Sequence, residues 1–170
     1  MITNFDHIHL YTADLDGTLA FYQRTLGAET IGALPNSHGG HNHLVLLGGQ
    51  FLAISHYPDG IEPRTPPEHG DGALTHGFGV AHFGLNVDDL APIIRRLEDA
   101  GIEVHSAPQG AGAVRYIYFT APDGVVIELT EYVLPAKLRP AAAALKVFNK
   151  GIHKARKAIG KALIKSATAS

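Results

Sequence analysis

The sequence contains no cysteine and no tryptophan, and no run of apolar residues approaches the 18 that a membrane-spanning helix needs. Without cysteine the chain has no disulfide, no thiolate zinc site, no iron–sulfur cluster and no cysteine nucleophile. The opening segment MITNFDHIHLYT has no basic stretch ahead of an apolar one, so we expect no secretory signal. These absences favour a cytoplasmic protein, and they leave His, Asp and Glu as the side chains for any metal.

Basic residues are scarce over most of the chain. Residues 1–136 contain all 16 acidic residues but only five of the 14 Lys and Arg, whereas residues 137–170 contain the other nine and no acid. The two parts therefore carry net charges of −11 and +9. With 45% apolar and 18% charged residues, the composition is that of a globular protein. We expect a domain over residues 1–136 and a basic tail over residues 137–170.

The first part contains an internal repeat with an offset of about 75 residues, which aligns His7 with His82 and Asp14 with Asp89. Each copy predicts a strand, a helix that begins after an aspartate and ends at a glycine, and three more strands. The sequence therefore predicts an α+β fold of two βαβββ modules, whose curved mixed sheets enclose a cleft. The modules are 4–57 and 79–132, joined by a proline-rich linker at 58–78. The predicted strands are 5–12, 28–33, 42–47, 50–56, 80–87, 102–106, 113–120 and 125–131, and the helices are 15–26 and 89–100.

Alternation along these strands places three potential metal ligands, His7, His82 and Glu128, on the face opposite the helices. Two neutral imidazoles and one carboxylate bind a divalent first-row metal and leave coordination positions open. A single inward histidine on a strand is more often a packed structural residue. Three such residues at repeat-related positions favour a metal site.

Three segments, DHIHLYTADLDGTLAFYQRTLG, AHFGLNVDDLAPIIRRLEDAGIEV and YFTAPDGVVIELTEY, resemble the vicinal oxygen chelate superfamily. That superfamily includes glyoxalase I, methylmalonyl-CoA epimerase, extradiol dioxygenases, and the bleomycin and fosfomycin resistance proteins. The resemblance covers about residues 4–133 and implies paired βαβββ modules around one metal held by His7, His82 and Glu128. The fourth ligand position of the family falls on Ala53, which cannot bind a metal.

Because Ala53 leaves three donors, the pattern is similar to the facial triad of extradiol dioxygenases and favours Fe(II), with Zn, Ni, Co or Mn as alternatives. Tyr118 lies ten residues before Glu128, a spacing similar to the extradiol signature, and His43 falls about where that family carries an acid–base histidine. His9 shares a strand face with His7, so the catalytic candidates are His43, Tyr118 and His9. Core packing of Tyr118 and a solvated position of His43 are the competing interpretations.

The resemblance predicts an Fe(II) extradiol-type dioxygenase that acts on a small catechol-like substrate. Two alternatives stay open: a glyoxalase-like lyase or epimerase with another divalent metal, and a non-catalytic resistance protein that binds a drug. We expect a homodimer, because each module presents edge strands that need cover. We expect no nucleic-acid partner.

The basic tail lies outside the resemblance and predicts an amphipathic helix that begins near Pro140. We expect its apolar stripe to pack on the same chain or on a dimer mate. The alternatives are a solvated tail and contact of residues 140–165 with an anionic membrane surface. The stripe consists of Leu145, Phe148, Ile152, Ala155, Ile159 and Leu163.

Overall fold

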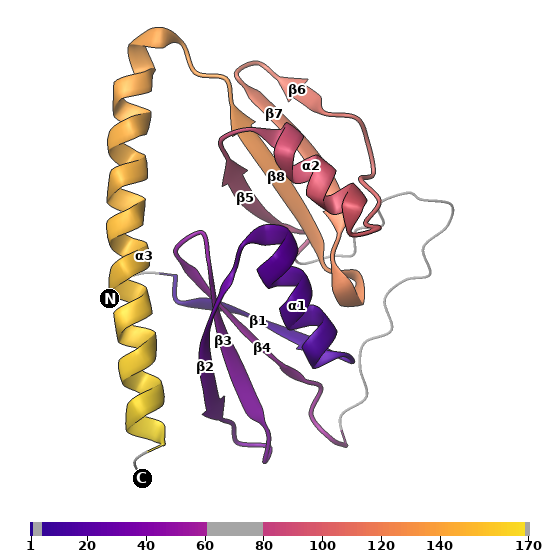
Figure 1. Cartoon of the computed structure of the whole chain (residues 1–170), viewed down its shortest axis with the longest axis vertical. Coiled ribbons are helices and arrows are strands. Elements are labelled where there is room, and N and C mark those ends of the chain that lie inside the picture. The colour runs from indigo at the N-terminus through magenta and orange to yellow at the C-terminus, as the bar shows by residue number, and fades with distance from the viewer. Residues whose placement is uncertain (2–4, 61–79, 169–170) are drawn as a thin grey trace. The chain divides into compact units, whose positions relative to one another are not determined.

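The computed structural model describes residue 1, residues 5–60 and residues 80–168 (Figure 1). Most of the predicted linker at 58–78 lies outside the described residues. The chain divides into two units, the first made of Met1–Glu62 with Pro140–Ser170 and the second of Pro63–Arg139. The basic tail thus groups with the first module, and a single domain over 1–136 stays a prediction. No helix within the described ranges is long and apolar enough to cross a membrane.

The first unit is a four-stranded mixed sheet with a helix on one face. Its elements are β1 (His7–Thr12), α1 (Leu15–Leu26), β2 (Glu29–Pro35), β3 (His41–Leu47) and β4 (Gln50–His56). The strand order is β1-β4-β3-β2, with β1 parallel to β4 and the other pairs antiparallel. The Asp14 side chain accepts a hydrogen bond from the Gly17 N–H at 3.0 Å and caps α1, while Gly27 ends it with a φ of 72°. Both helix limits are as predicted.

The second unit repeats this topology. It contains β5 (Phe83–Val87), α2 (Leu90–Asp99), β6 (Gln109–Ala111), β7 (Val114–Thr120) and β8 (Val126–Tyr132), in the order β5-β8-β7-β6. Ile8 pairs with Leu52 and Phe83 pairs with Ile127, so the two parallel strand pairs have the same register at an offset of 75. The predicted repeat of two βαβββ modules is confirmed.

The predicted strand at 102–106 is wrong. The structure has only an isolated bridge there, between Val104 and Phe119, and the edge strand β6 forms later at Gln109–Ala111. Pro108 lies between them, directly before β6, and has no N–H to donate to the ladder with β7.

Each sheet has one face packed under its helix and one face without a helix. In the first unit the Thr12 hydroxyl bonds the Thr18 hydroxyl of α1 at 2.8 Å, so the face of β1 that carries Thr12 is the α1 side. In the second unit Glu131 accepts a hydrogen bond from the Leu90 N–H at 3.1 Å, which places α2 on the Glu131 side of β8. We call the opposite face of each sheet its open face.

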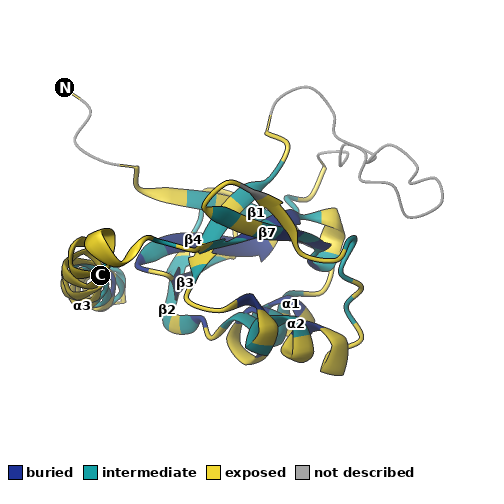
Figure 2. Cartoon of the chain, turned by 90° about the horizontal axis from the view of Figure 1, so that it is seen from above, coloured by how far each residue is buried: buried dark blue, intermediate teal, exposed yellow. Residues whose placement is uncertain are grey.

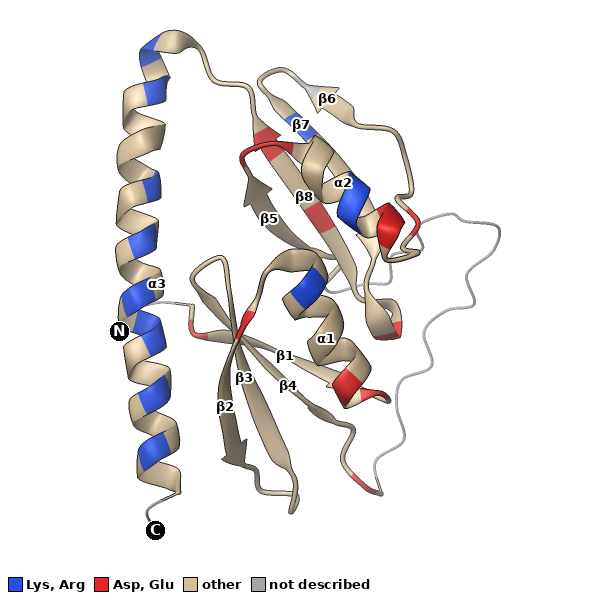
Figure 3. Cartoon of the chain, viewed as in Figure 1, with Lys and Arg blue, Asp and Glu red and all other residues tan. Residues whose placement is uncertain are grey.

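The tail forms one long helix, α3 (Arg139–Ala167), which follows the 3-10 turns η1 (Pro122–Gly124) and η2 (Ala136–Leu138) in the chain. It packs on the first unit through Gly160, where an added Cβ would lie only 3.0 Å from Ile31 and 3.1 Å from Phe51. His153 and Lys157 both bond the Glu29 carboxylate. The hydrogen bonds from Lys157 and then from His153 hold the pKa of Glu29 below its usual value. A second close contact is that of Ile164 with Gly32, so apolar contacts at two glycines and a cluster of charges hold the helix. Figure 2 shows that much of α3 is exposed, and Figure 3 shows Lys and Arg along its length.

The tail helix and its docking on the same chain are confirmed, but the predicted docking face is wrong. Leu145, Phe148, Ile159 and Leu163 are each more than half exposed, and of the predicted stripe only Ile152 is half-buried. The helix turns its Gly160 side to the sheet because a residue without a side chain permits the closest backbone approach. His153 and Lys157 form their ion pairs with Glu29 on that same side of the helix.

Candidate metal centre

Three side chains meet on the open face of the second unit. His82 Nε2 lies 3.2 Å from Glu128 Oε2, and the Tyr118 hydroxyl donates to Glu128 Oε1 at 3.1 Å. The His82 and Tyr118 rings meet edge to face, with centroids 5.2 Å apart. The two oxygens of one carboxylate are thus engaged by different partners.

Strand pairing explains why these three residues meet. Glu128 pairs with Tyr118 on β7 and with Gly84 on β5, and directly paired residues share a face of the sheet. His82 lies two residues before Gly84, and alternation brings its side chain to the same face. Ile127 and Leu129, on either side of Glu128, are almost fully buried on the α2 face, and this burial fixes the direction in which Glu128 points.

The Tyr118 phenol is a proton donor throughout the neutral range. Burial, followed by the hydrogen bond to the Glu128 carboxylate, raises the pKa of Tyr118 above its usual value. A protonated Tyr118 donates to Glu128, as observed, or to a substrate oxygen near it.

On the open face of the first unit, rings line β1. The ring centroids of His7 and His9 are 6.5 Å apart, and those of His9 and Tyr11 are 4.7 Å apart. The buried Ser55 hydroxyl donates to the His56 carbonyl, so the 2.9 Å contact between His9 Nε2 and Ser55 Oγ is a bond donated by His9. This tautomer leaves His9 Nδ1 as an acceptor. Burial, and then the charge of His7, lower the pKa of His9.

At one pair of repeat-related positions, the two units place the large and the small side chain on opposite strands. In the first unit His9 faces Ala53, and in the second unit Gly84 faces Glu128. A large side chain therefore opposes a small one in both sheets, but on opposite strands. The carboxylate at Glu128 is replaced by a methyl group at Ala53, and an imidazole stands on the strand beside it.

His43 lies on the other side of the sheet from His9. It pairs with Ile54 on β4, so it shares the α1 face, whereas Ala53 and Ser55 share the open face. Burial and the nearby His41 lower the pKa of His43, while Asp16 of α1 acts in the opposite direction. The register argues against joint action of His43 and His9 at one centre, and its acid–base role stays a prediction.

We expect His43→Gln to reduce the loss of stability on acidification. Because the folded-state pKa of His43 lies below the unfolded value of 6.5, the unfolded chain takes up the proton first as the pH falls. Folding is therefore weakened from about pH 6.5 down to the lowered pKa, and this penalty is absent in the glutamine variant. The urea unfolding midpoints of wild type and His43→Gln at pH 7.5 and 5.5 measure this effect. An equal fall of the midpoint in the two proteins would contradict the prediction.

Comparisons with known proteins show the family to which the chain belongs. The family model of the Glyoxalase/Bleomycin resistance protein/Dioxygenase superfamily matches residues 4–129. The chain belongs to this superfamily. Helix α3 lies beyond the matched residues, so it is not part of what defines the family.

One curated protein and two solved structures are similar to this chain over most of their own length. The glutathione transferase FosA of Serratia marcescens is 30% identical over 139 residues, covering 81% of this chain and 87% of the relative. The fosfomycin resistance protein FosX of Listeria monocytogenes, in complex with Mn(II) and sulfate, superposes with a TM-score of 0.56 at 22% identity, covering 81% and 99%. The antibiotic-binding protein TnmS3 of Streptomyces sp. CB03234 superposes with a TM-score of 0.57 at 26% identity, covering 77% and 97%.

The donor set of this superfamily member fits a divalent metal. Two ligand atoms on one metal, each about 2.0–2.2 Å from it, are separated by roughly 3.0–3.5 Å, and His82 Nε2 and Glu128 Oε2 are 3.2 Å apart. Within the described ranges neither unit by itself gathers three His, Asp or Glu side chains that could hold a metal. His7, which belongs to the first unit, stays the predicted third ligand beside His82 and Glu128.

Sequence reasoning missed a group of polar residues around His7. Asp6 Oδ2 lies 2.8 Å from His7 Nδ1, and Gln50 and Arg156 bond the backbone just before it. An aspartate directly before a candidate ligand is a signal that the sequence offers. The contacts of Gln50 and Arg156, which come from distant parts of the chain, leave no local pattern.

Proposed function

We propose that this protein is a divalent-metal enzyme that acts on a small molecule with neighbouring oxygen atoms, with His7, His82 and Glu128 as the metal ligands. The observation that carries the proposal is the convergence of His82, Glu128 and Tyr118 on one open face. A bound divalent metal would supply Lewis-acid polarisation of the substrate oxygens. Ala53 contributes no fourth ligand, which leaves coordination positions for the substrate.

Other residues of the chain hold or move protons. Tyr118 keeps its proton and donates a hydrogen bond, which orients Glu128 and is suited to a substrate oxygen. His9 has its Nε2 committed to Ser55 and is neutral near pH 7, so its Nδ1 is the atom suited to accept a proton. Acceptance of a proton by His9 and donation by Tyr118 give the chain an acid and a base.

Among reactions of this kind, we favour a fosfomycin-resistance-type reaction, in which a nucleophile opens a small oxygenated antibiotic. The support is the 30% identity to the glutathione transferase FosA over most of both chains. Fosfomycin carries an epoxide and a phosphonate, and so presents neighbouring oxygens to a metal. Because FosX from Listeria was solved with Mn(II), Mn(II) is the first metal to test.

An Fe(II) extradiol-type dioxygenase is the second candidate. It is favoured by the alanine at position 53, which leaves a donor set of two imidazoles and one carboxylate. The placement of the Tyr118 hydroxyl on Glu128 is also compatible with binding of a catecholic oxygen.

One assay separates these functions. Metal-free protein is loaded with Mn(II) or Fe(II) and given fosfomycin with and without glutathione, followed by phosphorus NMR, or given catechol in an oxygen electrode. We expect Mn(II)-dependent conversion of fosfomycin, abolished in Glu128→Gln, and no oxygen uptake. Oxygen uptake with Fe(II) and catechol would instead establish the dioxygenase. Tight drug binding without conversion would point to a non-catalytic resistance protein.

A further inference from the structure

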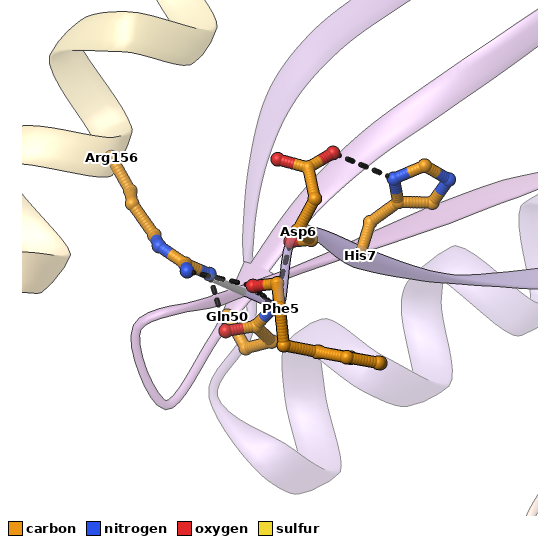
Figure 4. Close-up of polar contacts among 5 residues, drawn as sticks. All are labelled: Phe5, Asp6, His7, Gln50 and Arg156. Atoms are coloured by element: carbon orange, nitrogen blue, oxygen red, sulfur yellow. Dashed lines mark hydrogen bonds and ion pairs between the residues drawn. The ribbon is translucent and has the colours of Figure 1, made fainter. Parts of the chain in front are cut away.

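Arg156 of helix α3 extends toward the residues directly before β1 (Figure 4). Arg156 Nη2 donates to the Phe5 carbonyl at 3.0 Å, and Nη1 donates to the side-chain oxygen of Gln50. The guanidinium also lies over the Phe51 ring, 6.0 Å from its centroid. One side chain of the tail helix thus bonds both the segment before His7 and the first residue of β4.

The Gln50 amide carries this contact to the backbone of residues 5 and 6. Because its oxygen accepts from Arg156, its nitrogen points the other way and donates to the Phe5 carbonyl at 2.7 Å and the Asp6 carbonyl at 2.6 Å. These are the two carbonyls directly before His7, which itself pairs with Phe51. Arg156 therefore fixes the orientation of the amide that holds the entry to β1.

Asp6 in turn fixes the His7 imidazole. Its Oδ2 lies 2.8 Å from His7 Nδ1, so the neutral ring donates from Nδ1 and presents Nε2 as the free acceptor nitrogen. A carboxylate bound to one nitrogen of a metal-ligating histidine sets its tautomer and ring orientation and raises its basicity. Both side chains are largely exposed, so the pair depends on its backbone for a constant position.

We propose that Arg156 is a positioning residue for the metal ligand His7, acting through Gln50 and the backbone of Phe5 and Asp6. The inference rests on the proposed function, since it takes His7 as a ligand. It goes beyond it because α3 lies outside residues 4–129, where the family model matches. The basic tail then has a role in metal binding, in addition to covering part of the sheet.

The test is a titration of the metal-free full-length protein with Mn(II) and Co(II), read by calorimetry and by the Co(II) absorption spectrum. We expect Arg156→Ala and Gln50→Ala each to weaken metal affinity by about 10-fold, as outer partners of a ligand do. Both residues act through one network, so their effects should not add. The double variant should bind metal as tightly as the single variant with the lower affinity. Arg156→Lys keeps the charge but not the two-pronged donor, so its affinity should fall between wild type and Arg156→Ala.

Lys157→Ala is the matched control. Lys157 also docks α3 on the first unit, through Glu29, but no described contact joins it to Phe5, Asp6 or Gln50. It should lower thermal stability and leave metal affinity unchanged. In metal-free protein, amide hydrogen exchange in β1 should increase in Arg156→Ala more than in Lys157→Ala.

The possible results distinguish an error in the proposed ligand set from an error in the role of Arg156. If His7→Ala does not weaken metal binding, the proposed ligand set is wrong. If His7→Ala weakens it but Arg156→Ala does not, the ligand set stands and the positioning role is refuted. An equal loss of affinity in Lys157→Ala and Arg156→Ala would show that helix docking in general is responsible, which also refutes it.

Discussion

Replacing His82 with alanine should lower the affinity for divalent metal by more than about 100-fold. Loss of a partner of a ligand alone costs about 10- to 100-fold, and His82→Ala removes a ligand itself. Its Nε2 lies 3.2 Å from Glu128 Oε2, so the change also leaves that carboxylate without one of its two observed partners. Titration of the metal-free protein with Co(II) or Mn(II) measures the effect directly.

His105→Ala is the control for this experiment. His105 also belongs to the second unit and is half-buried, but its Nε2 bonds the Thr120 hydroxyl at 2.7 Å and not an acidic side chain. It should retain metal affinity even if it lowers stability. Full metal occupancy in His82→Ala, with the fold intact by circular dichroism, would remove His82 from the ligand set and with it the proposed centre.

The local parts of the fold were predictable from the sequence because the signals are local. Asp14 and Asp89 each accept a backbone hydrogen bond at a helix start, and Gly27 adopts the left-handed conformation that ends α1. Strand alternation was sufficient to bring His82 and Glu128 to one face, since a buried apolar residue lies on each side of Glu128. Periodicity and helix capping were therefore sufficient to predict the two modules and the shared face of His82 and Glu128.

Two features were not predicted: the face of the sheet on which His43 lies, and one long-range contact. His43 was a catalytic candidate by its position in the chain, but its pairing with Ile54 sets it on the α1 face. A change of one residue in register moves a side chain to the other face, and the two-residue Gly48–Gly49 turn, which pairs Leu47 with Gln50, sets the register of β3 against β4. The contact of Arg156 with Phe5 joins residues 151 positions apart, so it is visible only in the folded chain.

The hydropathy pattern of the tail predicted the wrong docking face for α3, because a close backbone contact determines how this helix packs. Gly160, which by propensity only weakens a helix, is the buried contact point of α3, while Phe148 is 63% exposed. Two glycines of α3 were equivalent in the sequence. The structure distinguishes them, because Gly151 has no atom within 4 Å of an added Cβ and Gly160 has Ile31 and Phe51 at about contact limit.

This difference leads to opposite expected effects of the same substitution. Gly151→Leu should stabilise the first unit by up to about 1 kcal/mol, because leucine is a better helix former and the site is open. Gly160→Leu should destabilise it by about 1–3 kcal/mol, since the larger side chain overlaps Ile31 and Phe51 and overpacking outweighs the helix propensity gained. The α3 contacts of Glu29 should weaken together with it, because they lie one to two turns away on the same side.

Chemical denaturation of the two variants and the wild type, followed by far-ultraviolet circular dichroism, gives the comparison. The two substitutions add the same side chain to the same helix, so propensity and hydrophobicity cancel and only the surroundings differ. Stabilisation by both variants would mean that α3 does not pack on the sheet through Gly160. Destabilisation by Gly160→Leu alone would establish that the tail is an integral part of the first unit, which is also the condition for Arg156 to reach the start of β1.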